Sequence, residues 1–204
     1  MMRIALVGRG AWGTRIEKTL SEIPQVEIIT VSREEPVPEG VSGAIIASPS
    51  STHAEVVLPY IERGLPVFIE KPMTTDITDA LRLKGVALES GSAVFVGHLY
   101  LFHGAFRALQ AALIDLGSIK KVSFVGHSTS SRDDGSPLWD WLPHGLSLAR
   151  AVLKSEPSSV LISINSVGQQ EGTYFFGDVP MDFSVAWDQH QKQMRFTVIA
   201  EGGE

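Results

Sequence analysis

The stretch RIALVGRGAWG (residues 3–13) decides the fold. Residues 3–7 form a short, continuous apolar run, which is typical of a buried β-strand. The glycines that follow, Gly8, Gly10 and Gly13, have the spacing G-x-G-x-x-G. Beyond them, apolar residues recur at helical spacing up to Ile23. The stretch therefore predicts a strand, a tight glycine turn and a helix.

A glycine turn of this kind lets the backbone approach a pyrophosphate and offers it the amides of a helix N-terminus. We therefore expect a bound dinucleotide to contact Gly8, Gly10, Ala11, Trp12 and Gly13. Two alternatives remain open at this point. One is a glycine-rich turn without a ligand, and the other is the related cradle for an adenosyl methyl donor.

Strand and helix signals alternate through the rest of the first half. Strands are predicted at 26–31, 43–47, 66–69 and 93–96, and helices at 53–63 and 76–90. Continuous apolar strands separated by helices indicate an α/β fold with a doubly wound parallel sheet, the Rossmann arrangement. We expect this dinucleotide-binding domain to cover residues 1–98, with its ligand at the carboxyl ends of the strands.

Residues 99–204 have a different pattern. Helices are predicted at 104–116 and 143–154, a strand at 120–127 and a loop at 128–137. Three runs that resemble long antiparallel strands complete the chain, at 160–167, 179–187 and 193–199. The prediction is a short α/β domain on a mostly antiparallel sheet. This sheet is expected to be truncated or to have an edge that another subunit covers.

Composition excludes several classes of protein. The 204 residues are 44% hydrophobic and 20% charged, as in a globular protein, and the net charge of −6 gives no footprint for nucleic acid. No apolar run is long enough for a membrane span and no signal peptide is visible, so we expect a cytoplasmic protein. The chain has no cysteine, which excludes disulfides, thiolate chemistry and cysteine-type zinc sites.

The end of the second strand bears on the choice of cofactor. An NAD-preferring domain usually places Asp or Glu there, whereas this chain has Ser32 and Arg33. A hydroxyl and a guanidinium suit a 2′-phosphate, so NADP is preferred over NAD. The alternative is that Arg33 is a solvated loop residue and that Glu34 or Glu35 binds the ribose.

Polar residues also follow the third and fourth strands. Ser48 and Pro49 are expected to line the cofactor, and His53 is placed beside them, although a capping or packing role is favoured for this histidine. Glu70 and Lys71 follow the fourth strand, and the ammonium of Lys71 is suited to donate to a substrate oxygen. The alternative for Lys71 is an ion pair with Glu70.

Asp140 and His144 are four residues apart at the start of a predicted helix, an offset that puts both on neighbouring surface. His144 is a suitable general base for an alcohol, and Asp140 is suited to orient the substrate or the imidazole. The alternative is an N-cap aspartate with a surface histidine. A metal site is not expected, because no third ligand recurs at a suitable spacing.

In this order, the glycine motif, Ser-Pro-x-x-x-His at 48–53, Glu-Lys-Pro at 70–72 and Asp-x-x-x-His at 140–144 resemble the Gfo/Idh/MocA oxidoreductases. The resemblance implies that Lys71 and His144 assist proton transfer and that Asp140 contacts substrate. It also implies that the second domain's sheet binds substrate and packs in homo-oligomers. Residues 138–140 and 143–144 are most similar to the branch that acts on sugars or nucleotide sugars.

The chain departs from this family in three places. Residues 101–104 read Leu-Phe-His-Gly where many relatives have Arg-Phe-x-Pro, and Gly145 and Ser147 follow the histidine where an aspartate is common. The family is also longer, so the second domain is expected to be a shortened one. These departures bear on the substrate contacts and on the orientation of His144.

Together these features predict an NAD(P)-dependent dehydrogenase or reductase that acts on a hydroxyl-bearing carbon of a small, sugar-like substrate. The alternative from another class is a non-catalytic NAD(P)-binding or regulatory protein with a degenerate substrate domain. A methyltransferase would leave the motifs downstream of the glycines unexplained.

Overall fold

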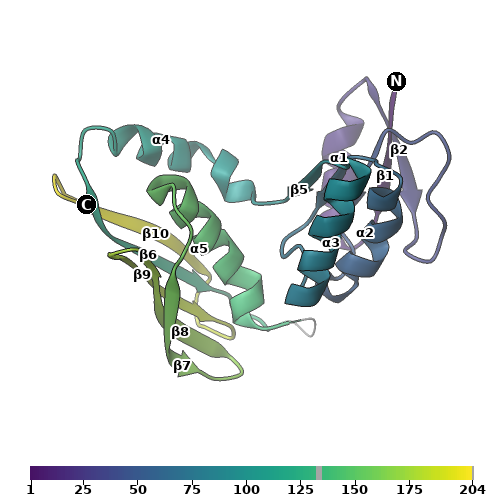
Figure 1. Cartoon of the computed structure of the whole chain (residues 1–204). Coiled ribbons are helices and arrows are strands. Elements are labelled where there is room, and N and C mark those ends of the chain that lie inside the picture. The colour runs from purple at the N-terminus through teal and green to yellow at the C-terminus, as the bar shows by residue number, and fades with distance from the viewer. Residues whose placement is uncertain (132–134, 204) are drawn as a thin grey trace. The chain divides into compact units, whose positions relative to one another are not determined.

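The computed structural model describes residues 1–131 and 135–203, so part of the predicted loop at 128–137 lies outside the described residues. The chain divides into two units, Met1–Gly97 and His98–Glu204 (Figure 1). Each unit contains one five-stranded sheet. Among the described residues, no helix combines the length and apolar character needed to cross a bilayer.

The first unit is a parallel sheet with the strand order β2-β1-β3-β4-β5. Its elements follow one another along the chain in this order, with a loop and no helix between the second and third strands: β1 (Met2–Val7), α1 (Ala11–Ser21), β2 (Val26–Val31), β3 (Gly43–Ile46), the short 3₁₀ helix η1 (Ser50–Thr52), α2 (His53–Glu62), β4 (Val67–Ile69), α3 (Ile77–Ser90) and β5 (Val94–Val96). The Rossmann-type sheet predicted from the apolar runs is confirmed.

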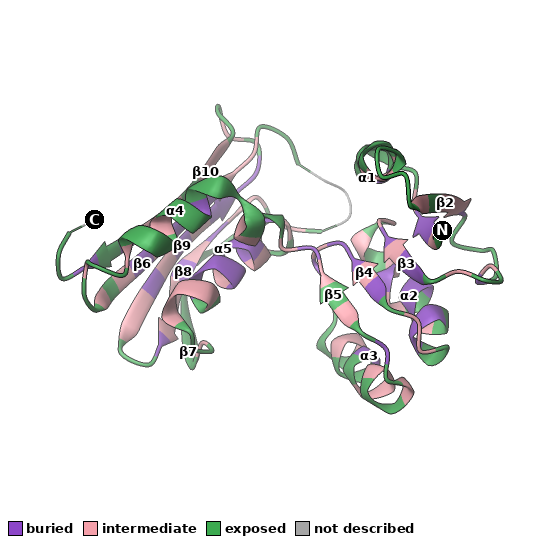
Figure 2. Ribbon diagram, turned by 90° about the horizontal axis from the view of Figure 1, so that it is seen from above, coloured by how far each residue is buried: buried purple, intermediate pink, exposed green. Residues whose placement is uncertain are grey.

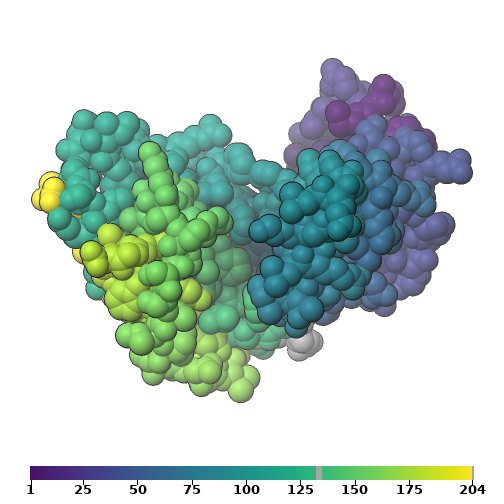
Figure 3. All heavy atoms as spheres, in the orientation of Figure 1, coloured from purple at the N-terminus to yellow at the C-terminus, as the bar shows by residue number. Residues whose placement is uncertain are grey.

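Both faces of this sheet are covered, because the chain runs outward from β1 in two directions. Helix α1 lies on one face, and α2 and α3 lie on the other (Figure 2). The two helices, blue in the space-filling view, cover the strands on the side facing the viewer (Figure 3). Val7, Ile46, Val57, Ile69 and Leu83 are almost fully buried between these layers. The strand order reverses between β1 and β3, which in open parallel sheets is the place for a ligand.

The second unit is a mixed sheet with the order β10-β6-β9-β8-β7, in which only β6 and β9 pair in parallel. Its elements are η2 (Leu99–Phe102), α4 (Gly104–Ala112), β6 (Ile119–His127), α5 (Pro137–Leu153), β7 (Ser159–Asn165), β8 (Gln169–Phe176), β9 (Val179–Ala186) and β10 (Gln193–Ala200). The predicted mostly antiparallel sheet is therefore confirmed.

Alternate residues of the central strands face α4 and α5 and form the core of the second unit. Phe124, Met181 and Phe183 are among its most buried members. Gly145 of α5 lies directly against this layer, since a Cβ there would lie 2.6 Å from the ring of Phe124. A larger residue at position 145 would not fit here without repacking.

The structure corrects two details of the second unit. Strand β8 is absent from the sequence-based prediction, because Gly172 weakens the strand signal. That glycine is required by close packing, since a Cβ on it would lie 2.3 Å from the carbonyl oxygen of Leu161. Helix α5 begins at Pro137, earlier than the predicted start at Pro143. Proline is favourable in a first turn, and Pro143 removes one helical hydrogen bond without ending the helix.

Candidate functional site

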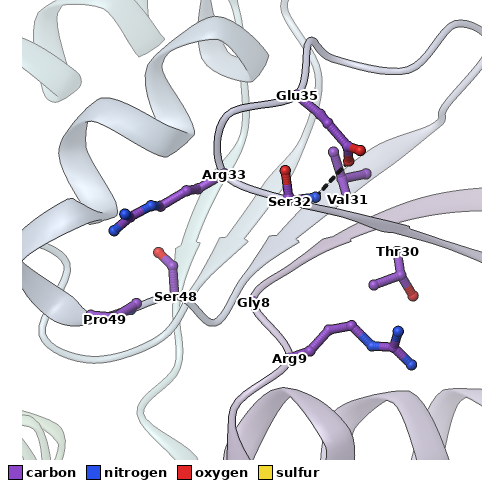
Figure 4. A pocket seen from close by; sticks show the side chains of 9 residues that line it. All are labelled: Gly8, Arg9, Thr30, Val31, Ser32, Arg33, Glu35, Ser48 and Pro49. Carbon is purple, nitrogen blue, oxygen red and sulfur yellow. Dashed lines mark hydrogen bonds between the residues drawn. The ribbon is translucent and has the colours of Figure 1, made fainter.

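A cavity of about 540 Å³ opens at the carboxyl ends of β1, β2 and β3, where the strand order reverses (Figure 4). Its volume is in the range of small-molecule and cofactor sites. Nine residues line it, and they come from the glycine turn, the end of β2 and the loop after β3: Gly8, Arg9, Thr30, Val31, Ser32, Arg33, Glu35, Ser48 and Pro49. Five of these, Gly8, Ser32, Arg33, Ser48 and Pro49, are among the predicted cofactor-binding residues.

The glycine turn has the geometry of a phosphate cradle. Gly8 has φ of +105°, and a Cβ on it would lie 2.5 Å from the carbonyl of Ala47. A Cβ on Gly13 would lie 1.9 Å from the carbonyl oxygen of Gly8. Gly10 is the N-cap residue of α1, and a Cβ on it would meet nothing within 4 Å. No side chain caps the first amides of α1, and its first turn has no acidic residue. The N-terminal amides of α1 therefore suit an anionic pyrophosphate.

Charged groups of both signs surround the end of β2. The backbone N–H of Ser32 donates to the carboxylate of Glu35 at 2.7 Å, which brings this carboxylate to the cavity wall. Nε of Arg33 donates to Oε1 of Glu34 at 2.5 Å, and this hydrogen bond lowers the pKa of the Glu34 carboxyl. Arg9 and Arg33 lie on opposite sides of the cavity. The lining therefore contains a guanidinium suited to the 2′-phosphate of NADP and a carboxylate suited to the ribose hydroxyls of NAD.

His53 is buried, with 1% of its surface exposed, and it does not line the cavity. Nδ1 lies 2.8 Å from the carbonyl oxygen of Pro72, and Nε2 lies 2.9 Å from that of Ser48. The ring therefore ties the Glu-Lys-Pro segment to the loop that lines the cavity. This is the packing role that the sequence favoured, and direct contact of His53 with a cofactor stays a prediction. Thr52 holds the N-cap position of α2, although its hydroxyl bonds to Ser48 and Pro49.

Glu70 connects the Glu-Lys-Pro segment to the glycine turn. Its side chain is almost buried, and the indole N–H of Trp12 donates to its carboxylate, as does the backbone N–H of Lys71. Burial raises the pKa of the Glu70 carboxyl, and these hydrogen bonds oppose the rise. The backbone N–H of Glu70 donates to Ile46 at 2.9 Å, and the Lys71–Pro72 bond is cis. Lys71 therefore follows β4 in a segment that is fixed to the cofactor end of the sheet.

In the second unit, Asp140 and His144 both lie in the N-terminal half of α5, as their offset of four predicted. The indole N–H of Trp187 donates to Oδ2 of Asp140 at 3.4 Å. His144 is 5% exposed, and the ring of Tyr100 meets its imidazole edge-on with centroids 4.8 Å apart. Burial raises the pKa of Tyr100, and the charge of Asp140 adds to this rise. The N-terminal end of α5 thus brings together a carboxylate, an imidazole and a phenol.

The predicted site residues fall into two sets. The cofactor set and Lys71 belong to the first unit, and Asp140 and His144 belong to the second. Within the described residues, no group of three or more His, Cys, Asp or Glu side chains has a metal-binding arrangement.

Sequence reasoning missed Arg9 and Thr30 in the first unit and Tyr100 and Trp187 in the second. Arg9 stands inside the glycine motif, where its place was a usable signal. Trp187 gives no such signal, because its contact spans 47 residues of sequence.

Residues 32–98 match the model of the oxidoreductase family with an NAD-binding Rossmann fold, GFO_IDH_MocA. Scyllo-inositol 2-dehydrogenase (NAD(+)) of Bacillus subtilis (strain 168) is 30% identical over 105 residues, which cover 52% of this chain and 30% of that relative. Inositol 2-dehydrogenase of Rhizobium meliloti (strain 1021) is 26% identical over 191 residues, covering 78% of this chain and 57% of that relative. The chain thus spans well under two thirds of the length of these relatives.

Solved structures extend the similarity over both units. A crystal structure of a protein from Magnetospirillum magnetotacticum MS-1 superposes with a TM-score of 0.85 at 28% identity, covering 98% of this chain and 75% of that one. Scyllo-inositol dehydrogenase from Lactobacillus casei, with bound NAD(H) and scyllo-inositol, gives a TM-score of 0.85 at 16% identity, covering 100% of this chain and 75% of that one, and shows the fold alone. The ordered motifs, the two-unit fold and these matches agree, and the chain is similar to the Gfo/Idh/MocA oxidoreductases, whose family model matches residues 32–98.

Proposed function

We propose that this protein is an NADP-dependent oxidoreductase acting on a hydroxyl-bearing carbon of a sugar-like or polyol substrate. The observation that carries the proposal is the cavity at the switch point of the first sheet, with its glycine cradle and two arginines. The nicotinamide cofactor, when bound, would accept or supply the hydride. The named relatives act on inositols, which supports a ring polyol as the class of substrate.

The chain's own residues would bind the cofactor and handle the proton. The amides at the start of α1 would bind the pyrophosphate, and Ser48 and Pro49 would lie along the cofactor. The family resemblance assigns proton transfer to Lys71 and His144 and substrate contact to Asp140. The indole N–H of Trp187 donates to the Asp140 carboxylate, and Tyr100 packs against the imidazole of His144.

The preference for NADP rests on the charges at the end of β2. Ser32 and Arg33 occupy the places where an NAD domain usually has a carboxylate, and Arg9 adds a second guanidinium to the cavity. The second candidate is NAD, favoured by one observation: the carboxylate of Glu35 also lines the cavity and is suited to accept ribose hydroxyls. The relative from Bacillus subtilis is named with this cofactor.

Titration with NADPH and NADH, followed by nicotinamide fluorescence, tests the cofactor. We expect both to bind and NADPH to bind more tightly. Tighter binding of NADH would select the second candidate, and failure of both to bind would refute the oxidoreductase proposal.

Turnover tests the proton chemistry. Inositols and hexoses are offered with NADP, and Lys71→Ala and His144→Ala are expected to lose turnover while they keep NADPH binding. If a cofactor binds but no polyol or sugar is oxidised, the non-catalytic alternative is favoured. If both variants stay active, the assigned proton roles are wrong.

The second unit is proposed to mediate homo-oligomers through its sheet. Strand β7 is exposed along its whole length at the edge of the sheet, and it carries apolar side chains such as Leu161 and Ile164. Light scattering on the purified protein tests this proposal. A monomer at all concentrations would refute it.

A further inference from the structure

Arg9 is placed at the cavity by the backbone of the glycine turn. It follows Gly8, whose positive φ is fixed by the close approach of Ala47, so its Cα has little freedom. Its side chain lines the cavity on the side of Thr30 (Figure 4). The position of Arg9 is therefore set by the cradle itself.

The fold makes little use of this guanidinium. The Arg9 side chain is 68% exposed, and its ion pair with Glu17 has an Nη2–Oε2 distance of 3.8 Å. An exposed pair of this length contributes little to stability. Glu17 also accepts a hydrogen bond from the hydroxyl of Thr30 at 3.4 Å. The guanidinium can thus leave Glu17 for a ligand at small cost.

Two arginines, on opposite sides of the cavity, and one carboxylate are among the residues that line it. Arg9 comes from the turn after β1, Arg33 comes from the end of β2, and Glu35 supplies the negative charge. A phosphate monoester presents several acceptor oxygens, so two planar forks can bind it from two directions. A ribose hydroxyl offers no such set of acceptors. The arrangement therefore distinguishes a phosphorylated from an unphosphorylated adenosine ribose.

We propose that Arg9 is a specificity residue that binds the 2′-phosphate of NADP together with Arg33. The inference rests on the proposed dinucleotide site and goes beyond it, because it gives Arg9 a role that NAD would not require. The competing role for Arg9 is a contact with the pyrophosphate, which NADP and NAD share.

Calorimetric titration with two pairs of ligands separates these roles. NADPH and NADH differ only in the 2′-phosphate, and so do adenosine 2′,5′-bisphosphate and 5′-AMP. For Arg9→Ala we expect affinity for the 2′-phosphorylated member of each pair to fall at least about tenfold, as for a lost charge-assisted hydrogen bond. Affinity for the other member is expected to change less than about twofold.

The matched control is Lys18→Ala, which removes one positive charge from the last turn of α1, away from the cavity lining. It is expected to leave both affinities within about twofold, since exposed charges beyond a Debye length are screened. Glu35→Gln is expected to raise the affinity for NADPH, because it removes a negative charge from the cavity. Thermal unfolding checks that every variant is folded.

Equal losses for both members of a pair in Arg9→Ala would assign Arg9 to the pyrophosphate and overturn the inference. Unchanged affinities would overturn it as well. When Arg9→Ala gives either of these results and the wild-type chain binds NADPH and NADH, the inference about Arg9 fails and the proposed function stands. If the wild-type chain binds neither, the proposed function has failed and the inference fails with it.

Discussion

Gly13→Ala is expected to destabilise the first unit, although alanine is the better helix former. A Cβ on Gly13 would lie 1.9 Å from the carbonyl oxygen of Gly8, and that atom belongs to the backbone. The start of α1 and the end of β1 would therefore have to separate by roughly 1 Å or more. Overpacking of this kind costs about 1–3 kcal/mol, whereas the helix gains up to about 1 kcal/mol from the change.

The expected net loss is about 1–2 kcal/mol, which corresponds to a fall in Tm of roughly 2–8 °C. Thermal unfolding followed by circular dichroism measures it, and nicotinamide fluorescence measures NADPH binding. We expect Gly13→Ala to lose both stability and affinity, because the shift moves the amides of α1 away from the phosphate cradle.

Two other glycines provide matched controls. A Cβ on Gly85 or on Gly10 would meet nothing within 4 Å. Gly85→Ala lies inside α3 and should stabilise the protein by about 1 kcal/mol without affecting NADPH. Gly10→Ala should keep its stability but bind NADPH less tightly, since its methyl group would occupy the approach of the pyrophosphate. If Gly13→Ala is as stable as the wild type, or Gly10→Ala binds NADPH normally, the reasoning about the cradle is wrong.

Three further predictions concern pH and packing. Burial raises the pKa of Glu70, so the wild type loses stability as the pH rises above the ordinary pKa of 4.5 and through the raised one. In urea unfolding, the stability of Glu70→Gln relative to the wild type should therefore increase over this rise in pH, and a constant difference would contradict this. The hydrogen bond from Lys120 lowers the pKa of Glu201 to about 2, so the stabilising charge of Glu201 is lost only as the pH falls towards that value. In Lys120→Ala, NMR titration should return the Glu201 midpoint towards about 4.3, and an unchanged midpoint would exclude the pair as the cause. Gly145→Asp should lower the Tm by overpacking against the ring of Phe124. An unchanged Tm would show that Phe124 can move aside without loss of stability.

The first unit could be predicted from local signals. Residues 3–7, 26–31 and 43–47 are predominantly apolar runs, and the first and third are followed by a turn and a helical pattern. Such runs occur where a strand is buried on both faces, and right-handed crossovers then leave few possible topologies. The glycine motif could be placed for the same reason, since its spacing is a property of adjacent residues.

The second unit was harder to predict because its strands depend on their neighbours. Strand β8 contains Gly172, which weakens a strand in isolation and is required only because the Leu161 carbonyl lies so close. The predicted start of α5 at Pro143 is too late, because Pro137 already provides a favourable first turn. At Gly172 close packing outweighs the low strand propensity of glycine, and at α5 the helix start at Pro137 precedes the one predicted at Pro143.

By itself, the sequence determined the fold class of both units, the glycine cradle and the positions of Lys71, Asp140 and His144 along the chain. Only the tertiary structure decided which side chains meet. It set Arg9 and Arg33 across one cavity, Trp12 against Glu70, and Trp187 against Asp140. Spacing along a chain fixes which residues share a strand or a helix face. Contacts between distant segments depend on strand register and on the space that other side chains leave, and no local pattern records these.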